Sequence, residues 1–203
     1  MDTASLVITL ARMGAGIGPA TLPTLDESID WQAVLDLADQ HRVAPLVRQA
    51  LSTAPSTAPA SLLAELKARM WRVAAARLLC ESVLGALLDT TASQGIEVLV
   101  LKGAALAHDL YPRPELRPYG DLDILCRPAD FPRLATALLE AGYRREDPND
   151  AAGLRPPLDS SRRRNFIDPL GGVLIEVHLD VLGLGLPARR REDCSGAARG
   201  LHH

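Results

Sequence analysis

Apolar residues change their spacing along the chain at Gly95. Before this glycine they recur three or four positions apart, as on a buried helix face, and after it short runs rich in β-branched residues appear. Helices are predicted at about 31–38, 45–51, 60–91, 104–110 and 128–141. Strands are predicted at 96–101, 121–126, 143–144, 165–168 and 173–179, the last two forming a hairpin. We therefore expect an α+β fold, in which an N-terminal helical layer precedes a small mixed β-sheet flanked by helices.

The ends of the chain and one internal stretch lack such periodicity. Glycine, proline and threonine are frequent between residues 12 and 30, and we expect residues 1–29 to form an irregular lead-in. Residues 30–94 then make the helical region and residues 95–186 make the core that holds the sheet. The polar, proline-containing stretch 146–163 is expected to be an exposed loop, and the arginine-rich residues 187–203 a disordered tail.

The composition of the chain limits the classes of molecule that the protein is expected to bind. The 203 residues carry a formal net charge of −3, and they include only two Trp, three Tyr and two Phe. This argues against a protein that neutralises duplex phosphates or stacks bases on a sheet. The arginine runs 162–164 and 189–191 leave nucleic-acid binding as the weaker alternative. Three cysteines far apart, with no secretory or membrane-spanning signal, predict a soluble cytoplasmic protein without a membrane partner.

The sequence Asp121-Leu122-Asp123 is the first candidate for chemistry. On a strand, Asp121 and Asp123 share one face, about 7 Å apart along the backbone. Two neighbouring carboxylates repel each other unless a cation lies between them, and Mg²⁺ prefers oxygen ligands. The alternatives are an edge strand with a solvated acidic face and a structural cation site.

Two further elements could complete such a site. Alternation along 173–179 places Glu176 and His178 on one face, so that pairing with 121–126 would add a third carboxylate. Three carboxylates can hold two metal ions about 3.5–4 Å apart, as in phosphoryl-transfer enzymes. Lys102-Gly103 lies where a strand leads into a helix, whose free N–H groups attract anions. Taken alone, Glu176 would be a rim carboxylate, His178 a packed histidine and Lys102-Gly103 an ordinary turn.

The order of these elements resembles the nucleotidyltransferase superfamily that includes DNA polymerase beta and the MNT-like proteins. It is most similar to an uncharacterised bacterial nucleotidyltransferase family whose members open with Leu-Lys-Gly. The similarity covers about residues 30–180 and includes an upstream segment, Gln40–Leu46. The matching core motifs are Leu101-Lys102-Gly103, Tyr111-Pro112, Leu116-Arg117-Pro118, Gly120–Leu125 and Ile175-Glu176-Val177-His178.

The resemblance implies a role for each acidic residue. Asp121 and Asp123 would coordinate Mg²⁺ bound to a nucleoside triphosphate. Glu176 would bind a second Mg²⁺ or deprotonate the acceptor hydroxyl, so two ions are expected.

The resemblance also implies a set of nucleotide-binding residues. Lys102 and Gly103 would hold the triphosphate, and Arg117 would contact a phosphate. His178 joins this set, with simple packing as its alternative role.

The implied activity is the Mg²⁺-dependent transfer of a nucleoside monophosphate from a nucleoside triphosphate to an unknown small-molecule or protein acceptor, with release of pyrophosphate. Members of the similar family continue with helices after the Glu-x-His strand, whereas this chain continues with residues 182–187 and the arginine-rich tail. We therefore expect a C-terminally truncated member. The alternative function is a non-catalytic remnant that binds a nucleotide or a partner.

Overall fold

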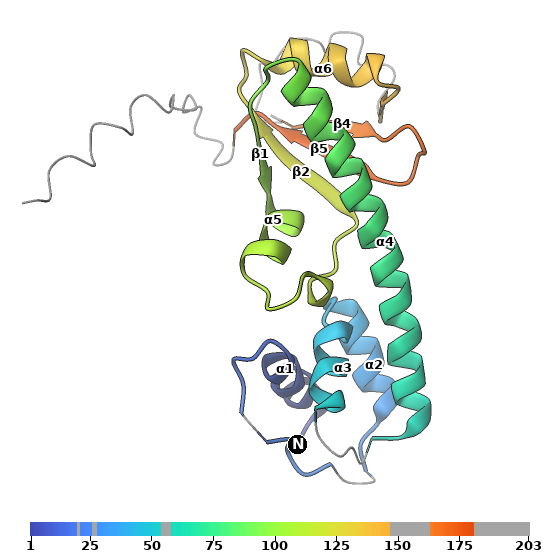
Figure 1. Cartoon of the computed structure of the whole chain (residues 1–203). Coiled ribbons are helices and arrows are strands. Elements are labelled where there is room, and N and C mark those ends of the chain that lie inside the picture. Colours follow the sequence, from blue (N-terminus) through green and yellow to red (C-terminus); the bar gives the residue numbers. More distant parts are fainter. Residues whose placement is uncertain (20, 26–27, 54–57, 147–162, 181–203) are drawn as a thin grey trace, which may run out of the picture.

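The described part of the chain comprises an α+β fold of six α-helices, one short 3₁₀-helix and a five-stranded mixed sheet (Figure 1). This computed structural model describes residues 1–19, 21–25, 28–53, 58–146 and 163–180. The predicted tail at 187–203 and nearly all of the predicted loop at 146–163 lie outside these residues. The predicted fold class is confirmed.

The chain begins with a helix where the sequence predicts irregular structure. Helix α1 spans Thr3–Gly14, and the carboxylate of Asp2 accepts a hydrogen bond from the N–H of Ser5 as an N-cap. Its apolar residues Leu6 and Val7 lie about one helical turn before Leu10, and all three are buried. The prediction of an irregular segment over residues 1–29 is therefore wrong for this first part, because the capping aspartate and the short apolar stripe outweigh the glycines that follow.

Helices α2 (Trp31–Gln40) and α3 (Ala44–Ser52) pack with α1 into a core of their own. Asp30 caps α2 by accepting a hydrogen bond from the N–H of Ala33. Pro45 occupies the first turn of α3, where its missing N–H is not needed.

Helix α4 (Ala60–Ser93) is the element that joins the two parts of the molecule (Figure 1). Its first turns bury Leu62 and Leu66 in the core of α1–α3. Its last turns bury Cys80, Val83 and Leu87 in a second core beneath the sheet. Of the predicted helical layer, α4 therefore reaches the sheet while α1–α3 pack around its other end. Among the described helices, α4 included, none is both long and apolar enough to cross a membrane.

The sheet has the strand order β1-β2-β5-β4-β3. Only β2 and β5 run parallel, and the other neighbours are antiparallel. The strands are β1 (Val98–Leu101), β2 (Asp121–Cys126), β3 (Arg144–Arg145), β4 (Arg163–Ile167) and β5 (Leu174–His178). The connecting helices are α5 (Lys102–Asp109), the 3₁₀-helix η1 (Pro114–Leu116) and α6 (Phe131–Glu140).

The two faces of the sheet differ in polarity. Leu122, Ile124, Ile175 and Val177 point to one side and are buried in the core built with α4, α5 and α6. By strand alternation, Asp123 and Glu176 point to the opposite side. The apolar face of the sheet is thus buried by packing, and the opposite face carries polar side chains.

The hairpin that carries β5 is held by one buried aspartate. The carboxylate of Asp168 is fully buried and accepts hydrogen bonds from the N–H groups of Leu170, Gly172 and Val173. Three orphan donors at the turn are thereby satisfied, which fixes where β5 starts and hence the register of Glu176.

Two glycine-to-alanine substitutions are expected to change stability in opposite directions. A Cβ at Gly14 would lie 2.0 Å from the carbonyl oxygen of Leu46, so α1 could no longer contact α3 backbone to backbone. Gly14→Ala should therefore lower the free energy of unfolding by more than about 1 kcal/mol. Gly85 lies within α4 with open space around it, so Gly85→Ala should raise the same quantity by about 0.5–1 kcal/mol. Urea unfolding monitored by circular dichroism measures both, and a neutral Gly14→Ala would contradict the α1–α3 contact.

Candidate active site

The parallel pair β2–β5 aligns the residues that the sequence analysis places on polar faces. Asp123 is the register partner of Glu176, and Leu125 is the partner of His178. Partners in register project to the same side of a sheet. The pairing on which the predicted cluster depends is therefore present, and it brings Asp123, Glu176 and His178 together.

These three side chains form a compact polar cluster. One potential ligand atom from each, two carboxylate oxygens and an imidazole nitrogen, lie within 4.8 Å of one another. His178 Nε2 is 2.7 Å from Asp123 Oδ1 and 3.6 Å from Glu176 Oε2. Asp123 and His178 are buried, whereas Glu176 is half-buried, so the cluster opens toward solvent on the Glu176 side.

Lys102 completes the cluster from the end of β1. Its backbone has a φ of 47°, an uncommon value for a residue other than glycine, as the chain turns from β1 into α5. Its Nζ donates a hydrogen bond to Asp123 Oδ1 at 2.7 Å and lies 4.0 Å from Glu176 Oε2. The ammonium group therefore supplies the cation that two adjacent carboxylates require.

The charge on Asp123 is strongly favoured. Burial acts to raise the pKa of this carboxyl, but the hydrogen bonds from Lys102 and His178 outweigh it and hold the pKa below its usual value. Asp123 is thus ionised at neutral pH even though its side chain is only 5% exposed. An ionised oxygen pair at this position is what a divalent cation would need.

The N-terminus of α5 lies next to the cluster. Leu101, the N-cap of α5, is the β1 partner of Asp123, and no side chain caps the first free N–H groups of the helix. Gly103 lies in this first turn, and a Cβ there would come within 2.8 Å of Tyr119 Cβ. The glycine therefore lets the loop before β2 pack closely against the start of α5, and the helix N-terminus remains available to an anion.

The other two predicted site residues lie outside the compact cluster. Asp121 is half-buried at the start of β2 on the same face as Asp123, and its carboxylate makes no hydrogen bond or ion pair with other described residues. Arg117 donates a hydrogen bond to the carbonyl of Pro118 at 3.4 Å and forms no ion pair with the described acids.

The donor set fits a divalent cation. Two carboxylates suit hard ions such as Mg²⁺ and Mn²⁺, while the imidazole suits Zn²⁺. The Lys102 ammonium lies close to both acids, so a metal ion and this ammonium would compete for them. Because 56% of the Lys102 side chain is exposed, it can turn outward when a cation enters.

Two contacts of this cluster are absent from the sequence analysis. The salt bridge between Lys102 and Asp123 joins residues 21 positions apart, and nothing in the local pattern indicates it. The bond between His178 and Asp123 could have been inferred, because His178 lies two residues beyond Glu176 on the same strand face.

Comparison with known proteins bears directly on this arrangement. A family model described as an uncharacterised nucleotidyltransferase matches residues 27–198. No curated protein and no solved structure matches the chain significantly. The matched range contains α2–α6, the five described strands and every residue of the polar cluster. Because it spans most of the chain, the protein belongs to this family of uncharacterised nucleotidyltransferases.

Proposed function

We propose that the protein transfers a nucleoside monophosphate from a nucleoside triphosphate to an acceptor hydroxyl, in a Mg²⁺-dependent reaction that releases pyrophosphate. Membership of the family supports the nucleotidyl transfer itself. The observation that carries the finer assignment is the register of β2 and β5, which sets Asp123 beside Glu176 directly next to the start of α5. A site for divalent cations and a site for phosphates thereby adjoin each other.

Each group in the cluster has a distinct part in this proposal. Asp123 and Glu176 hold cations, and Asp121 adds a third carboxylate at the start of the same strand face. Mg²⁺ held by these carboxylates would neutralise phosphate charge and help to orient the phosphates for in-line attack. The acceptor oxygen bonds to the α-phosphorus, the bond to the β-phosphate oxygen breaks, and pyrophosphate leaves. Glu176 either accepts the proton of the acceptor hydroxyl, or would bind the second cation, in which case that proton passes to solvent.

The residues around α5 act on the triphosphate. The free N–H groups of the first turn and the positive end of the helix dipole favour the phosphate oxygens. Lys102, released from Asp123 when a cation enters, brings its ammonium to the same phosphates. His178 keeps Asp123 oriented through its bond to Oδ1. The protein thus contributes position and charge compensation rather than a covalent intermediate.

One observation favours a second candidate function. The Lys102 ammonium already lies 2.7 Å from Asp123 and 4.0 Å from Glu176, so it partly compensates the acid pair without a catalytic metal ion. This candidate predicts nucleotide binding without pyrophosphate release. Measurement of pyrophosphate from each of the four nucleoside triphosphates, with Mg²⁺ or Mn²⁺, separates the two functions.

Asp123→Asn is expected to abolish nucleotide turnover. The amide cannot supply the charge that balances a divalent ion, so Mg²⁺-dependent thermal stabilisation by a nucleoside triphosphate should disappear. Pyrophosphate release should fall by at least about 100-fold, since even residues that only support metal ligands contribute 10–100-fold. Asp121→Asn should act in the same direction.

Asp89→Asn is the matched control for these two variants. Asp89 is exposed on α4 and forms no hydrogen bond or ion pair with the described residues. It should retain wild-type turnover and wild-type thermal stabilisation. Turnover that persists in the Asp121→Asn, Asp123→Asn double variant would rule out the proposed role of the pair.

Lys102→Ala is expected to separate metal binding from nucleotide binding. Without the competing ammonium, the affinity for Mn²⁺ alone should rise about five-fold, as an ion pair of about 1 kcal/mol implies. The affinity for the Mg²⁺–triphosphate complex should fall, because a phosphate contact is lost. Electron paramagnetic resonance of Mn²⁺ and calorimetry with the nucleotide measure the two effects. Lys67→Ala, which alters the other lysine of the chain, should change neither, and unchanged Mn²⁺ affinity in Lys102→Ala would contradict the competition.

A further inference from the structure

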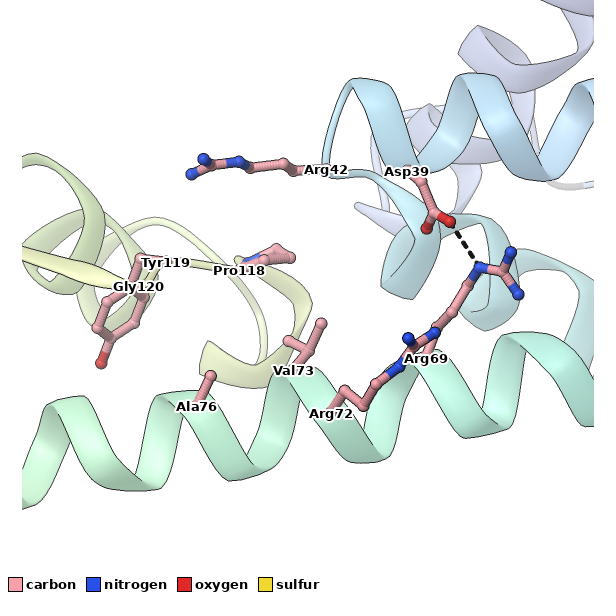
Figure 2. Close-up of a pocket in the computed structure, with 9 residues that line it drawn as sticks. All are labelled: Asp39, Arg42, Arg69, Arg72, Val73, Ala76, Pro118, Tyr119 and Gly120. Carbon is pink, nitrogen blue, oxygen red and sulfur yellow. Dashed lines mark hydrogen bonds and ion pairs between the residues drawn. The ribbon is translucent and has the colours of Figure 1, made fainter. Parts of the chain in front are cut away.

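A pocket separate from the Asp123 cluster lies beside the middle of α4, between the core of α1–α3 and the core under the sheet (Figure 2). Its volume is about 450 Å³, within the range of small-molecule sites. Three arginines line it, Arg42 from the turn after α2 and Arg69 and Arg72 from α4. The opposite wall is the loop Pro118–Gly120, which leads directly into Asp121.

The pocket carries positive charge that the described residues do not neutralise. Arg69 is paired with Asp39 at 2.6 Å and with Glu65 at 2.7 Å. The guanidinium groups of Arg42 and Arg72, in contrast, form no hydrogen bond or ion pair with any described residue. In Figure 2 the side chain of Arg42 extends from the end of α2 toward the loop of Pro118 and Tyr119. Two uncompensated guanidinium groups thus flank one cavity of an otherwise acidic chain.

Arg42 occupies a backbone position that usually belongs to glycine. The N–H of Val43 bonds to the carbonyl of Ala38 and the N–H of Arg42 bonds to that of Asp39, which is the Schellman arrangement at a helix end. The residue at the position of Arg42 adopts a left-handed conformation, and Arg42 has a φ of 56°. Glycine would adopt this conformation without steric cost, so the turn itself does not explain an arginine.

We propose that this pocket binds the phosphate group of a small phosphomonoester. The guanidinium fork matches phosphate oxygens in geometry and charge, and two unpaired forks balance a dianion. The paired Arg69 keeps its position through two carboxylates and shapes the floor of the site. A ligand held here would bridge α2, α4 and the loop before β2. This inference does not depend on nucleotidyl transfer, because none of these residues belongs to the Asp123 cluster.

The test uses two variants that remove charge without disturbing the fold. Arg42→Gly retains the left-handed turn, and its melting temperature without ligand should equal or exceed that of the wild type. Arg72→Gln keeps a long side chain on an exposed helical position. The probes are inorganic phosphate and ribose 5-phosphate, each titrated by calorimetry without divalent metal, against sodium chloride of equal ionic strength. Each variant should bind both probes at least ten-fold more weakly than the wild type.

Three controls decide between this pocket and other sources of phosphate binding. Arg12→Ala removes an exposed arginine of α1 outside the pocket and should bind both probes as the wild type does. Lys102→Ala and Asp123→Asn alter the proposed catalytic cluster, so a loss of binding confined to these variants would assign the bound probe to that cluster. The proposal is overturned if Arg42→Gly and Arg72→Gln bind the probes normally, if Arg12→Ala weakens binding equally, or if Lys102→Ala alone abolishes it. Tighter binding of ribose 5-phosphate than of inorganic phosphate supports a phosphomonoester, and the reverse order contradicts it.

Discussion

The parallel pairing of β2 with β5 is the constraint on which the candidate active site depends. It sets two carboxylates side by side on a half-buried surface, where like charges repel and only a cation can relieve them. Because side chains alternate along a strand, a slip of one residue would turn Glu176 into the apolar core and leave Asp123 alone. The Asp168 turn and the packing of Ile175 and Val177 hold the register that prevents this slip.

The local sequence pattern predicts most helices and strands of the fold. For the candidate site, it predicts only which polar side chains share a strand face. Alternation along β2 and β5 identifies which side chains share a face before any strand is paired. It does not identify the neighbours of a strand, so the meeting of Asp123 with Glu176 stays conditional in the sequence. The contact from Lys102 depends on an unusual backbone angle at the β1–α5 junction. Helix α1 departs from the expected irregular lead-in because its capping Asp2 and its buried apolar residues precede the glycine-rich stretch.

The arginine pocket illustrates a different limit of sequence reasoning. Its walls come from residues 39–42, 69–76 and 118–120. Taken alone, the sequence of each stretch indicates only a helix end, a helix face or a loop. The arginine runs 162–164 and 189–191, which stand out in the sequence, lie largely outside the described residues. The arginines of this pocket are far apart in the sequence, and only folding brings them together. Composition therefore does not predict the pocket.

Helix α4 fixes how far one core is rotated relative to the other about the helix axis. It is a continuous rod of 34 residues whose ends are anchored in separate cores, with the arginine pocket against its middle. Each residue of an α-helix advances the chain by 1.5 Å and turns it by about 100°. Adding a single residue to the exposed central turns would leave both cores with their own contacts, yet swing one against the other by about a quarter of a revolution. The number of residues in α4 therefore sets the rotation of one core relative to the other. A change in that number would alter the cavity between the two cores without substituting any residue that lines it.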